Sequence, residues 1–319
     1  MSNEQLPLFR RSNARARTRP LASPVSGEPL DPSSSLSAAV SAFHGHMIRE
    51  GLSPHTVRAF GSDLRLFLNY VGPNSPVNEI SGQSLNRFLD YLRFERGAPC
   101  KPKSFQRRLT TLKVFFSWLT QTGVISEDPA APIAHLPVAS PLPQILYSDQ
   151  FGQLLEAARQ LRRGRKPDVR PYLLLTLLLS TGIKKSEAMG LRLGDIDLSN
   201  PEQGTLFIRY DDARRRQKER KLRLPPDFAV VLREYREQYQ PKEHLFECTA
   251  RNLEYVLGDL AKMTGLGDTV SFESLRWTCA VQDYEKGLAE DHIRQKLGLS
   301  PITWEEAGDK LRRLAAKPL

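Results

Sequence analysis

The sequence predicts a mainly α-helical protein with a small β-sheet, organised in two domains. The chain has 319 residues, enough for two domains that each bury a hydrophobic core. Apolar residues recur at helical spacing through most of the chain, whereas two short segments in the second half alternate as strands do. A proline-rich stretch over residues 128–146 predicts a fairly stiff, extended linker between the two halves.

Residues 1–35 are predicted to form a disordered, basic tail. They are rich in Ser, Pro and Arg and contain few residues that a core would bury. The arginines either follow a DNA backbone or stay solvated. A mitochondrial presequence is a third reading, which the lack of a clear apolar helical face disfavours. The five arginines are Arg10, Arg11, Arg15, Arg17 and Arg19.

Residues 36–127 are predicted to form a compact bundle of four helices. Four apolar stripes at helical spacing follow one another, and each indicates one buried helix face. Ser53 and Pro54 are typical of a helix start, with the serine as N-cap and the proline in the first turn. The stripes begin at Leu36, Val57, Leu85 and Phe105.

Residues 147–319 are predicted to form the mixed domain. A buried helix spans 173–179, and strands are expected at 204–210 and 221–224, joined by a very basic turn. Thr303 and Glu306 form a predicted capping box for a last amphipathic helix. This helix either docks on a neighbouring protomer or packs on its own domain.

Composition indicates the class of partner. Lys and Arg number 46 against 36 Asp and Glu, a net charge of +10 that favours a polyanion such as DNA. Cys100, Cys248 and Cys279 lack metal-ligand spacing, so reduced thiols in a cytoplasmic protein are expected, with no metal and no cofactor. The longest apolar run, 172–179, is too short to span a membrane.

Several motifs resemble those of the tyrosine recombinases, the phage integrase family with its Xer-like members. STGIKKSEAMGL, residues 180–191, resembles their Thr-Gly-Leu-Arg-x-Ser-Glu motif, and Leu275-Arg276 and Leu297-Gly298 resemble parts of His-x-Leu-Arg and Leu-Gly-His. Residues 52–71 and 103–133 are similar to the first and last helices of the core-binding domain. The resemblance implies a helical, SAM-like core-binding domain and a catalytic-type domain that close as a C-shaped clamp around double-stranded DNA.

The resemblance also implies a degenerate active site. Of six catalytic positions, Arg276 alone keeps the expected residue. The other five positions, in chain order, hold Lys184 for the first arginine, Arg215 for the lysine, Glu273 and Leu299 for the two histidines, and Gly308 for the tyrosine. The assignment of Arg215 stays open, because a slip of a few residues places Lys218 there instead.

These departures predict loss of catalysis. Glycine has no nucleophilic side chain, and no tyrosine follows Tyr284, which is expected to pack in the core. Lysine lacks the planar fork of arginine, and arginine does not release a proton near neutral pH. A glutamate about 4 Å from a phosphate would be repelled by roughly 4 kcal/mol. We therefore expect Glu273 to pair with Lys184 or Arg276.

The sequence thus favours a catalytically inactive recombinase homologue that binds double-stranded DNA. It would assemble with an active tyrosine recombinase, or with itself through the C-terminal helix. One alternative is an active recombinase whose nucleophile arrives in trans from a partner, and another is a decayed product with little function. The residues expected to contact DNA are Arg107, Arg108, Lys113, Lys184, Arg215, Lys218 and Arg276.

Overall fold

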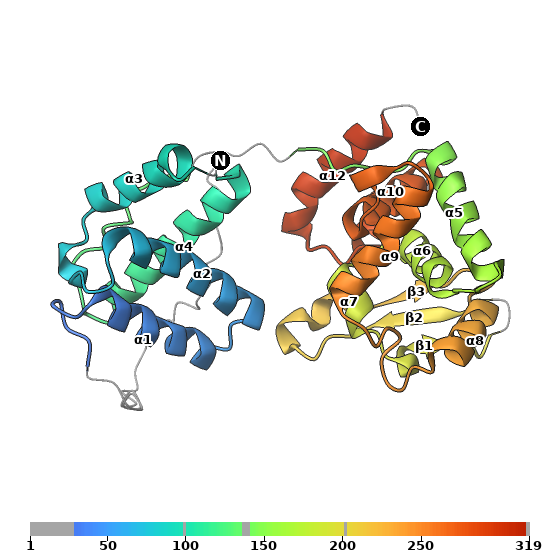
Figure 1. The fold of residues 1–319 in the computed structure, drawn as a ribbon, viewed down its shortest axis with the longest axis horizontal. Helices are drawn as coiled ribbons and strands as arrows, with labels where there is room; N and C mark the ends of the chain where they lie inside the picture. The colour runs from blue at the N-terminus through green and yellow to red at the C-terminus, as the bar shows by residue number, and fades with distance from the viewer. Residues whose placement is uncertain (1–28, 98–99, 136–140, 201–202, 317–319) are drawn as a thin grey trace. The chain divides into compact units, whose positions relative to one another are not determined.

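The chain divides into two compact units, residues 1–140 and 141–319 (Figure 1). The structure, a computed structural model, describes residues 29–97, 100–135, 141–200 and 203–316. The division falls inside the predicted linker, and each unit has its own hydrophobic core. Most of the predicted tail, residues 1–28, and with it all five of its arginines, lies outside the described residues.

The first unit is a helical bundle, as predicted. Ser53 caps the second helix: its Oγ accepts a hydrogen bond from the backbone N–H of Thr56 at 3.1 Å. Aromatic rings fill the core, with Phe67 and Phe88 in edge contact at 5.0 Å between ring centroids. The elements are α1 (Leu36–Arg49), α2 (Pro54–Val71), η1 (Val77–Glu79), α3 (Gly82–Asp90), the π-helix η2 (Tyr91–Glu95) and α4 (Pro102–Gln121).

Two segments predicted to be loose are folded onto this bundle. Leu30 packs against the core and the N–H of Leu36 donates to the carbonyl of Ser75 at 2.8 Å, so residues 29–35 are not disordered as predicted. Ala130 is fully buried, because residues 128–133 form turns against the bundle instead of an extended spacer. Burial of these few apolar residues outweighs the local polar and proline-rich composition.

The second unit is a helical domain with one small sheet. The sheet is antiparallel in the order β1-β2-β3, and its register pairs Leu206 with Leu222. The first strand was not predicted, since two residues carry no alternation pattern. The strands are β1 (Ile196–Asp197), β2 (Thr205–Ile208) and β3 (Arg220–Arg223); the helices are α5 (Ser148–Arg163), α6 (Arg170–Thr181), α7 (Lys185–Gly190), α8 (Phe228–Tyr239), α9 (Ala250–Met263), α10 (Phe272–Glu285), α11 (Glu290–Lys296) and α12 (Pro301–Ala315), with short turns η3 (Leu193–Asp195), η4 (Ala213–Lys218) and η5 (Gly267–Thr269).

Helix α6 forms the centre of this unit. It is apolar on all sides, and α5, α8, α9 and α10 pack around it (Figure 1). Gly182 ends it in the left-handed conformation, φ +60°, which turns the chain sharply toward α7. A Cβ at this position would also lie 3.0 Å from the Leu297 side chain, so the turn requires glycine.

Helix α12 begins earlier than predicted. Its N-cap is Ser300, whose Oγ accepts from the N–H of Thr303 at 3.3 Å, and the predicted capping box of Thr303 and Glu306 is therefore wrong. Pro301 in the first turn explains the earlier start, because its fixed φ suits that position. The helix packs on its own unit, together with Tyr284, whose predicted core position is confirmed.

The described part of the chain holds no helix long and apolar enough to cross a membrane. Across the same residues, no group of three or more His, Cys, Asp or Glu side chains is arranged to hold a metal ion. All three cysteines are free thiols.

Candidate phosphate-binding site

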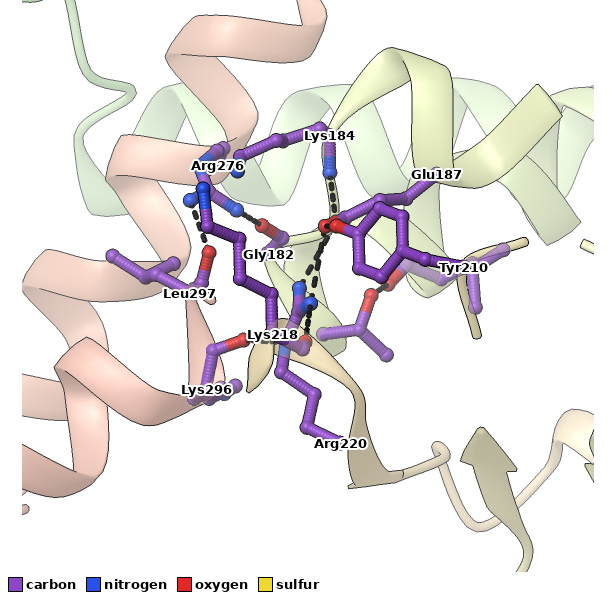
Figure 2. Close-up of polar contacts among 11 residues, drawn as sticks. Gly182, Lys184, Glu187, Tyr210, Lys218, Arg220, Arg276, Lys296 and Leu297 are labelled. Atoms are coloured by element: carbon purple, nitrogen blue, oxygen red, sulfur yellow. Dashed lines mark hydrogen bonds and ion pairs between the residues drawn. The ribbon is translucent and has the colours of Figure 1, made fainter. Parts of the chain in front are cut away.

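Three cationic side chains from separate elements converge in the second unit (Figure 2). Lys184 lies between α6 and α7, Arg276 on the first turns of α10, and Lys218 at the end of η4. The turn at Gly182 positions Lys184, and the β2-β3 hairpin positions Lys218. Residues that are 92 positions apart in the chain therefore share one site.

Arg276 is held by backbone carbonyl groups. Its Nη1 donates to the carbonyl of Gly182, and its Nη2 donates to the carbonyl of Leu297 at 2.5 Å. Burial lowers the pKa of Arg276 to about 10, so the guanidinium remains charged at neutral pH. The two predicted motifs containing Gly182 and Leu297 thus serve, through main-chain atoms, to orient this arginine.

Lys184 is half-buried beside two other cations. Burial, together with the charges of Arg276 and Lys218, lowers the pKa of Lys184 to about 8 against the opposing effect of Glu187. Its backbone N–H donates to Glu187 Oε2 at 2.8 Å, which fixes the start of α7. An anion in this site would reverse the shift, because it would stabilise the charged amine.

A buried ion pair between Glu187 and Arg220 lies next to these cations and fixes the backbone around them. Arg220 donates to both carboxylate oxygens of Glu187, at 3.0 and 2.9 Å, and its Nε donates to the carbonyl of Lys296 at 2.6 Å. Tyr210 donates its hydroxyl to the same carboxylate. Burial alone would raise the pKa of Glu187, but the bonds and charge of Arg220 outweigh it and lower the pKa to about 2.

The arrangement leaves a net positive charge in the site. Arg220 neutralises Glu187, and the charges of Lys184, Lys218 and Arg276 have no ion-pair partner among the residues that the structure describes. Three converging cations match the oxygens of a phosphate group. The chemistry available is therefore recognition of a phosphate, with charge stabilisation of its oxygens.

Glu273 lies at the rim of this site and is exposed. It lines an open cavity of about 630 Å³ together with Lys184, Arg276 and Trp277. The expected ion pair with Lys184 or Arg276 does not form among the described residues, so that prediction is wrong. Exposure is the reason: a solvated carboxylate gains little from pairing.

Lys218, and not Arg215, reaches the site. The side chain of Lys218 runs toward Arg276 (Figure 2), and the Lys218 carbonyl accepts from Arg220 at 3.2 Å. Arg215 is 52% exposed, and its guanidinium lies over the ring of Tyr210 at 5.9 Å. The sequence left open whether Arg215 or Lys218 takes this position. The turn η4 ends at Lys218, and it is this lysine whose side chain is directed toward Arg276.

Leu299 and Gly308 contribute no reactive group. Leu299 is half-buried and packs with the apolar residues under α12. Gly308 is buried on the inner face of α12, where a Cβ would lie 3.1 Å from Nε1 of Trp304. The position that resembles that of the nucleophile therefore carries no reactive group and lies against the indole ring of Trp304.

The bases predicted to contact DNA in the first unit have internal partners. Arg107 Nη1 lies 2.8 Å from the buried carboxylate of Asp63, and Arg108 Nε lies 3.6 Å from it. Arg108 is 14% exposed, whereas Arg107 is 40% exposed and still accessible. Lys113 donates to the carbonyl of Ala131 at 3.0 Å. Only the exposed parts of Arg107 and Lys113 remain available to a ligand.

Sequence reasoning missed the supporting ion pair. Glu187 stands in the Ser-Glu of the first motif, just before the buried Ala188, and a buried carboxylate needs a partner for its charge. Arg220 stands two residues after Lys218, at the start of a strand, where a basic run conceals it. Composition could not distinguish the one inward arginine from its exposed neighbours.

Comparisons with known proteins cover both units. Residues 40–123 match the phage integrase N-terminal SAM-like domain, and residues 144–303 match the phage integrase family. The chain is 24% identical over 288 residues to tyrosine recombinase XerD of Listeria innocua, covering 86% of this chain and 94% of that protein. It is 32% identical over 163 residues to tyrosine recombinase XerC of Mycobacterium leprae, covering 50% and 54%.

Solved structures of low sequence identity share the fold. XerH site-specific recombinase bound to palindromic difH substrate, in a post-cleavage complex, gives a TM-score of 0.71 at 18% identity, covering 91% of this chain and 97% of that one. A lambda integrase dimer bound to a COC' core site gives 0.66 at 17% identity, covering 88% and 78%. The predicted fold class is confirmed by these likenesses.

Proposed function

Because the chain belongs to the phage integrase family, whose members include the tyrosine recombinases, we propose that it binds duplex DNA and acts as a catalytically inactive partner in site-specific recombination. The observation that carries the proposal is Gly308, a buried glycine under Trp304 where the family resemblance places a nucleophile. No tyrosine follows Tyr284 that could replace it.

The phosphate-binding site supports DNA binding. The site has three cations that could bind a DNA phosphate, but the position of the nucleophile holds Gly308. Under this proposal the site still binds phosphate and cannot form a covalent bond to it. The exposed bases of η4, Arg214, Arg215 and Arg216, extend the same charge along the hairpin. The two domains predicted from the sequence, 36–127 and 147–319, would enclose the duplex as a clamp.

Assembly with other protomers is part of the proposal. The lambda integrase relatives are described as a dimer on a core site and a tetramer on a Holliday junction. By analogy this chain would join either further copies of itself or an active recombinase. In such an assembly it would occupy a DNA half-site without cutting it, and so act as an accessory or regulatory subunit.

A footprint on the DNA that flanks its own gene, at 50 and 200 mM salt, tests binding. If roughly 6–10 phosphates are neutralised, affinity should fall by about 10³–10⁵ between these salt concentrations. Lys218→Ala should weaken binding, whereas Lys286→Ala, at an exposed residue after α10, should not. A flat salt response would contradict the proposal.

A suicide DNA substrate tests the loss of chemistry. The chain alone should form no covalent protein-DNA adduct under conditions in which an active tyrosine recombinase does. The retained phosphate site favours one second candidate, in which a partner's tyrosine attacks a phosphate held here. In that case, mixing with the partner should yield an adduct on the half-site that this chain occupies, and Lys218→Ala should reduce it.

A further inference from the structure

A second basic surface lies at the other end of α6 from the phosphate-binding site. Helix α6 runs from Arg170 to Thr181, and at about 1.5 Å per residue it separates its two ends by about 18 Å. The phosphate-binding site follows its C-terminus, at Gly182. The loop 164–169, between α5 and α6, lies at its N-terminus.

The cations of this surface are exposed and make no ion pair among the described residues. The distal basic surface, as it is called below, consists of Arg163, Arg165, Lys166, Arg233 and Arg236. The neighbouring carboxylates already have partners: Glu234 accepts Arg162 at 2.7 Å, and Asp168 accepts the Tyr239 hydroxyl at 2.7 Å. Glu237 is the one exposed acid of α8 without such a bond.

The surface is preorganised. Arg162 bonds both carboxylate oxygens of Glu234, which joins the end of α5 to α8, and Figure 1 shows these two helices side by side there. Gln238 of α8 accepts from the N–H of Val169 at 3.0 Å and donates to the carbonyl of Pro167. The backbone at the end of the loop is therefore fixed to the helix.

We propose that the distal basic surface binds the phosphate backbone of a second DNA segment while the phosphate-binding site holds the first. This inference rests on the proposed function, because it assumes that the first site binds a duplex. Exposed arginines and lysines without an ion pair among the described residues suit a row of phosphates, and each phosphate neutralised releases a condensed counterion. The contact would be independent of sequence, since phosphates carry no base information.

An acidic protein is the less suitable occupant. Stable protein interfaces have an apolar, often aromatic centre, whereas α8 exposes one large apolar side chain, Val230. One protomer holding two DNA segments would bring two recombination sites together, or bend one long segment back on itself. Either outcome suits an accessory subunit that does not cut.

The test is a bridging assay with the full chain. A biotinylated duplex is immobilised, the protein is added, and capture of a second, fluorescent duplex is measured over a range of salt. The variant Arg165→Glu/Lys166→Glu reverses two distal cations. The control Lys262→Glu/Lys286→Glu makes the same change of net charge at exposed positions on α9 and after α10.

We expect the distal variant to bind a single duplex within about twofold of wild type and to lose about two from the salt slope of second-duplex capture. The control should bridge like wild type. Sedimentation must give the same oligomeric state for all three proteins, so that bridging by altered dimers is excluded. Thermal unfolding confirms that each is folded.

Each other outcome has a distinct meaning. Failure of the wild type to bind even one duplex overturns the proposed function. Single-duplex binding without bridging, or bridging that the distal variant retains, overturns this inference alone. If the distal variant loses binding to a polyglutamate peptide but keeps bridging, the surface takes an acidic protein and its assignment to DNA is wrong.

Discussion

Lys184 is half-buried and has two cationic neighbours, and its pKa of about 8 is lower than that of Arg276, about 10. Lys184 therefore loses its charge at a lower pH than Arg276 does. Arginine in the same place would stay charged at every accessible pH, whereas this lysine titrates near the working range. The departure from the family motif thus changes the pH response of binding as well as its geometry.

DNA affinity should fall as pH rises through the pKa of Lys184, about 8 in the free protein. A bound phosphate favours the charged amine, so binding takes up a proton above that pH. Between pH 7 and 9 the loss should be about tenfold. Fluorescence anisotropy titrations of a labelled duplex measure it, and Lys184→Arg should remove the dependence. An equal fall in the Arg variant would assign the effect to another group.

Restoring a tyrosine at position 308 should not restore cleavage. A Cβ there would lie 3.1 Å from Trp304 Nε1, so Gly308→Tyr overpacks the face under α12 and should lower the free energy of unfolding by about 1–3 kcal/mol. Gly258→Tyr is the matched control, because a Cβ at Gly258 on α9 meets no atom within 4 Å. Urea unfolding and the suicide substrate give the two readouts; an adduct from Gly308→Tyr would contradict this.

At the scale of elements, the ion pair of Glu187 and Arg220 joins α7, β3 and α11. Glu187 is 1% exposed, and the Arg220 Nε reaches the carbonyl of Lys296 at the end of α11. Lys184 directly precedes α7, Lys218 lies two residues before β3, and Arg276 donates to the carbonyl of Leu297 just after α11, so this buried contact joins the segments next to all three cations. The sequence predicted β3 from its alternation but gave no periodic signal for α7 or α11, and it could not show a pairing across 33 residues.

Acid should weaken the second unit through this pair. The pKa of Glu187 is lowered from 4.5 to about 2, so its stabilisation is complete above pH 4.5 and is lost as pH falls toward 2. The loss should be about 3 kcal/mol, measured by urea unfolding at several pH values. Glu187→Gln should cost about 3–5 kcal/mol at pH 7, since it leaves Arg220 buried and unpaired.

The matched control for that experiment is Glu254→Gln. Glu254 pairs with Lys185 at 2.6 Å, but both side chains are 47% exposed. Removal of such a pair should change the unfolding free energy by less than about 1 kcal/mol. Equal effects of the two substitutions would mean that the buried pair has no special part in stability.

Element boundaries were predicted less well than elements. Thr303 and Glu306 have the spacing of a capping box. Ser300 and Pro301 also fit a helix start, as N-cap and first helical residue, and α12 begins there. The two-residue strand β1 and the turn η4 left no periodic signal. The turn decides which basic residue, Arg215 or Lys218, enters the phosphate-binding site, and that choice depends on tertiary geometry.

At the scale of the whole molecule, the chain consists of two compact units. The first buries a core rich in phenylalanine and the second a core centred on α6, and no buried cluster contains residues of both. The length and the proline-rich stretch predicted two domains, and the division between residues 140 and 141 falls inside that stretch. The packing of 29–35 and 128–133 against the first core was not predicted. The composition of a segment averages over its residues, whereas burial here depends on single side chains such as that of Ala130.

Fragments 29–135 and 141–316 should each fold alone. Each contains one complete core, so each should show cooperative thermal unfolding with its own midpoint. Their DNA affinities should be about 10²–10⁴ lower than that of the whole chain, because the linker makes the second contact intramolecular. Circular dichroism and anisotropy measure both; a fragment without a cooperative transition would show that the units depend on each other.

The indole of Trp304 against Gly308 makes the loss of the nucleophile hard to reverse in evolution. A tyrosine introduced here would have to displace the indole, because its Cβ would lie 3.1 Å from Trp304 Nε1. Recovery would require Trp304 to shrink first, which would open a cavity under α12 and lower stability without benefit. We therefore expect that a nucleophile at this position would need two changes together, one at Gly308 and one at Trp304.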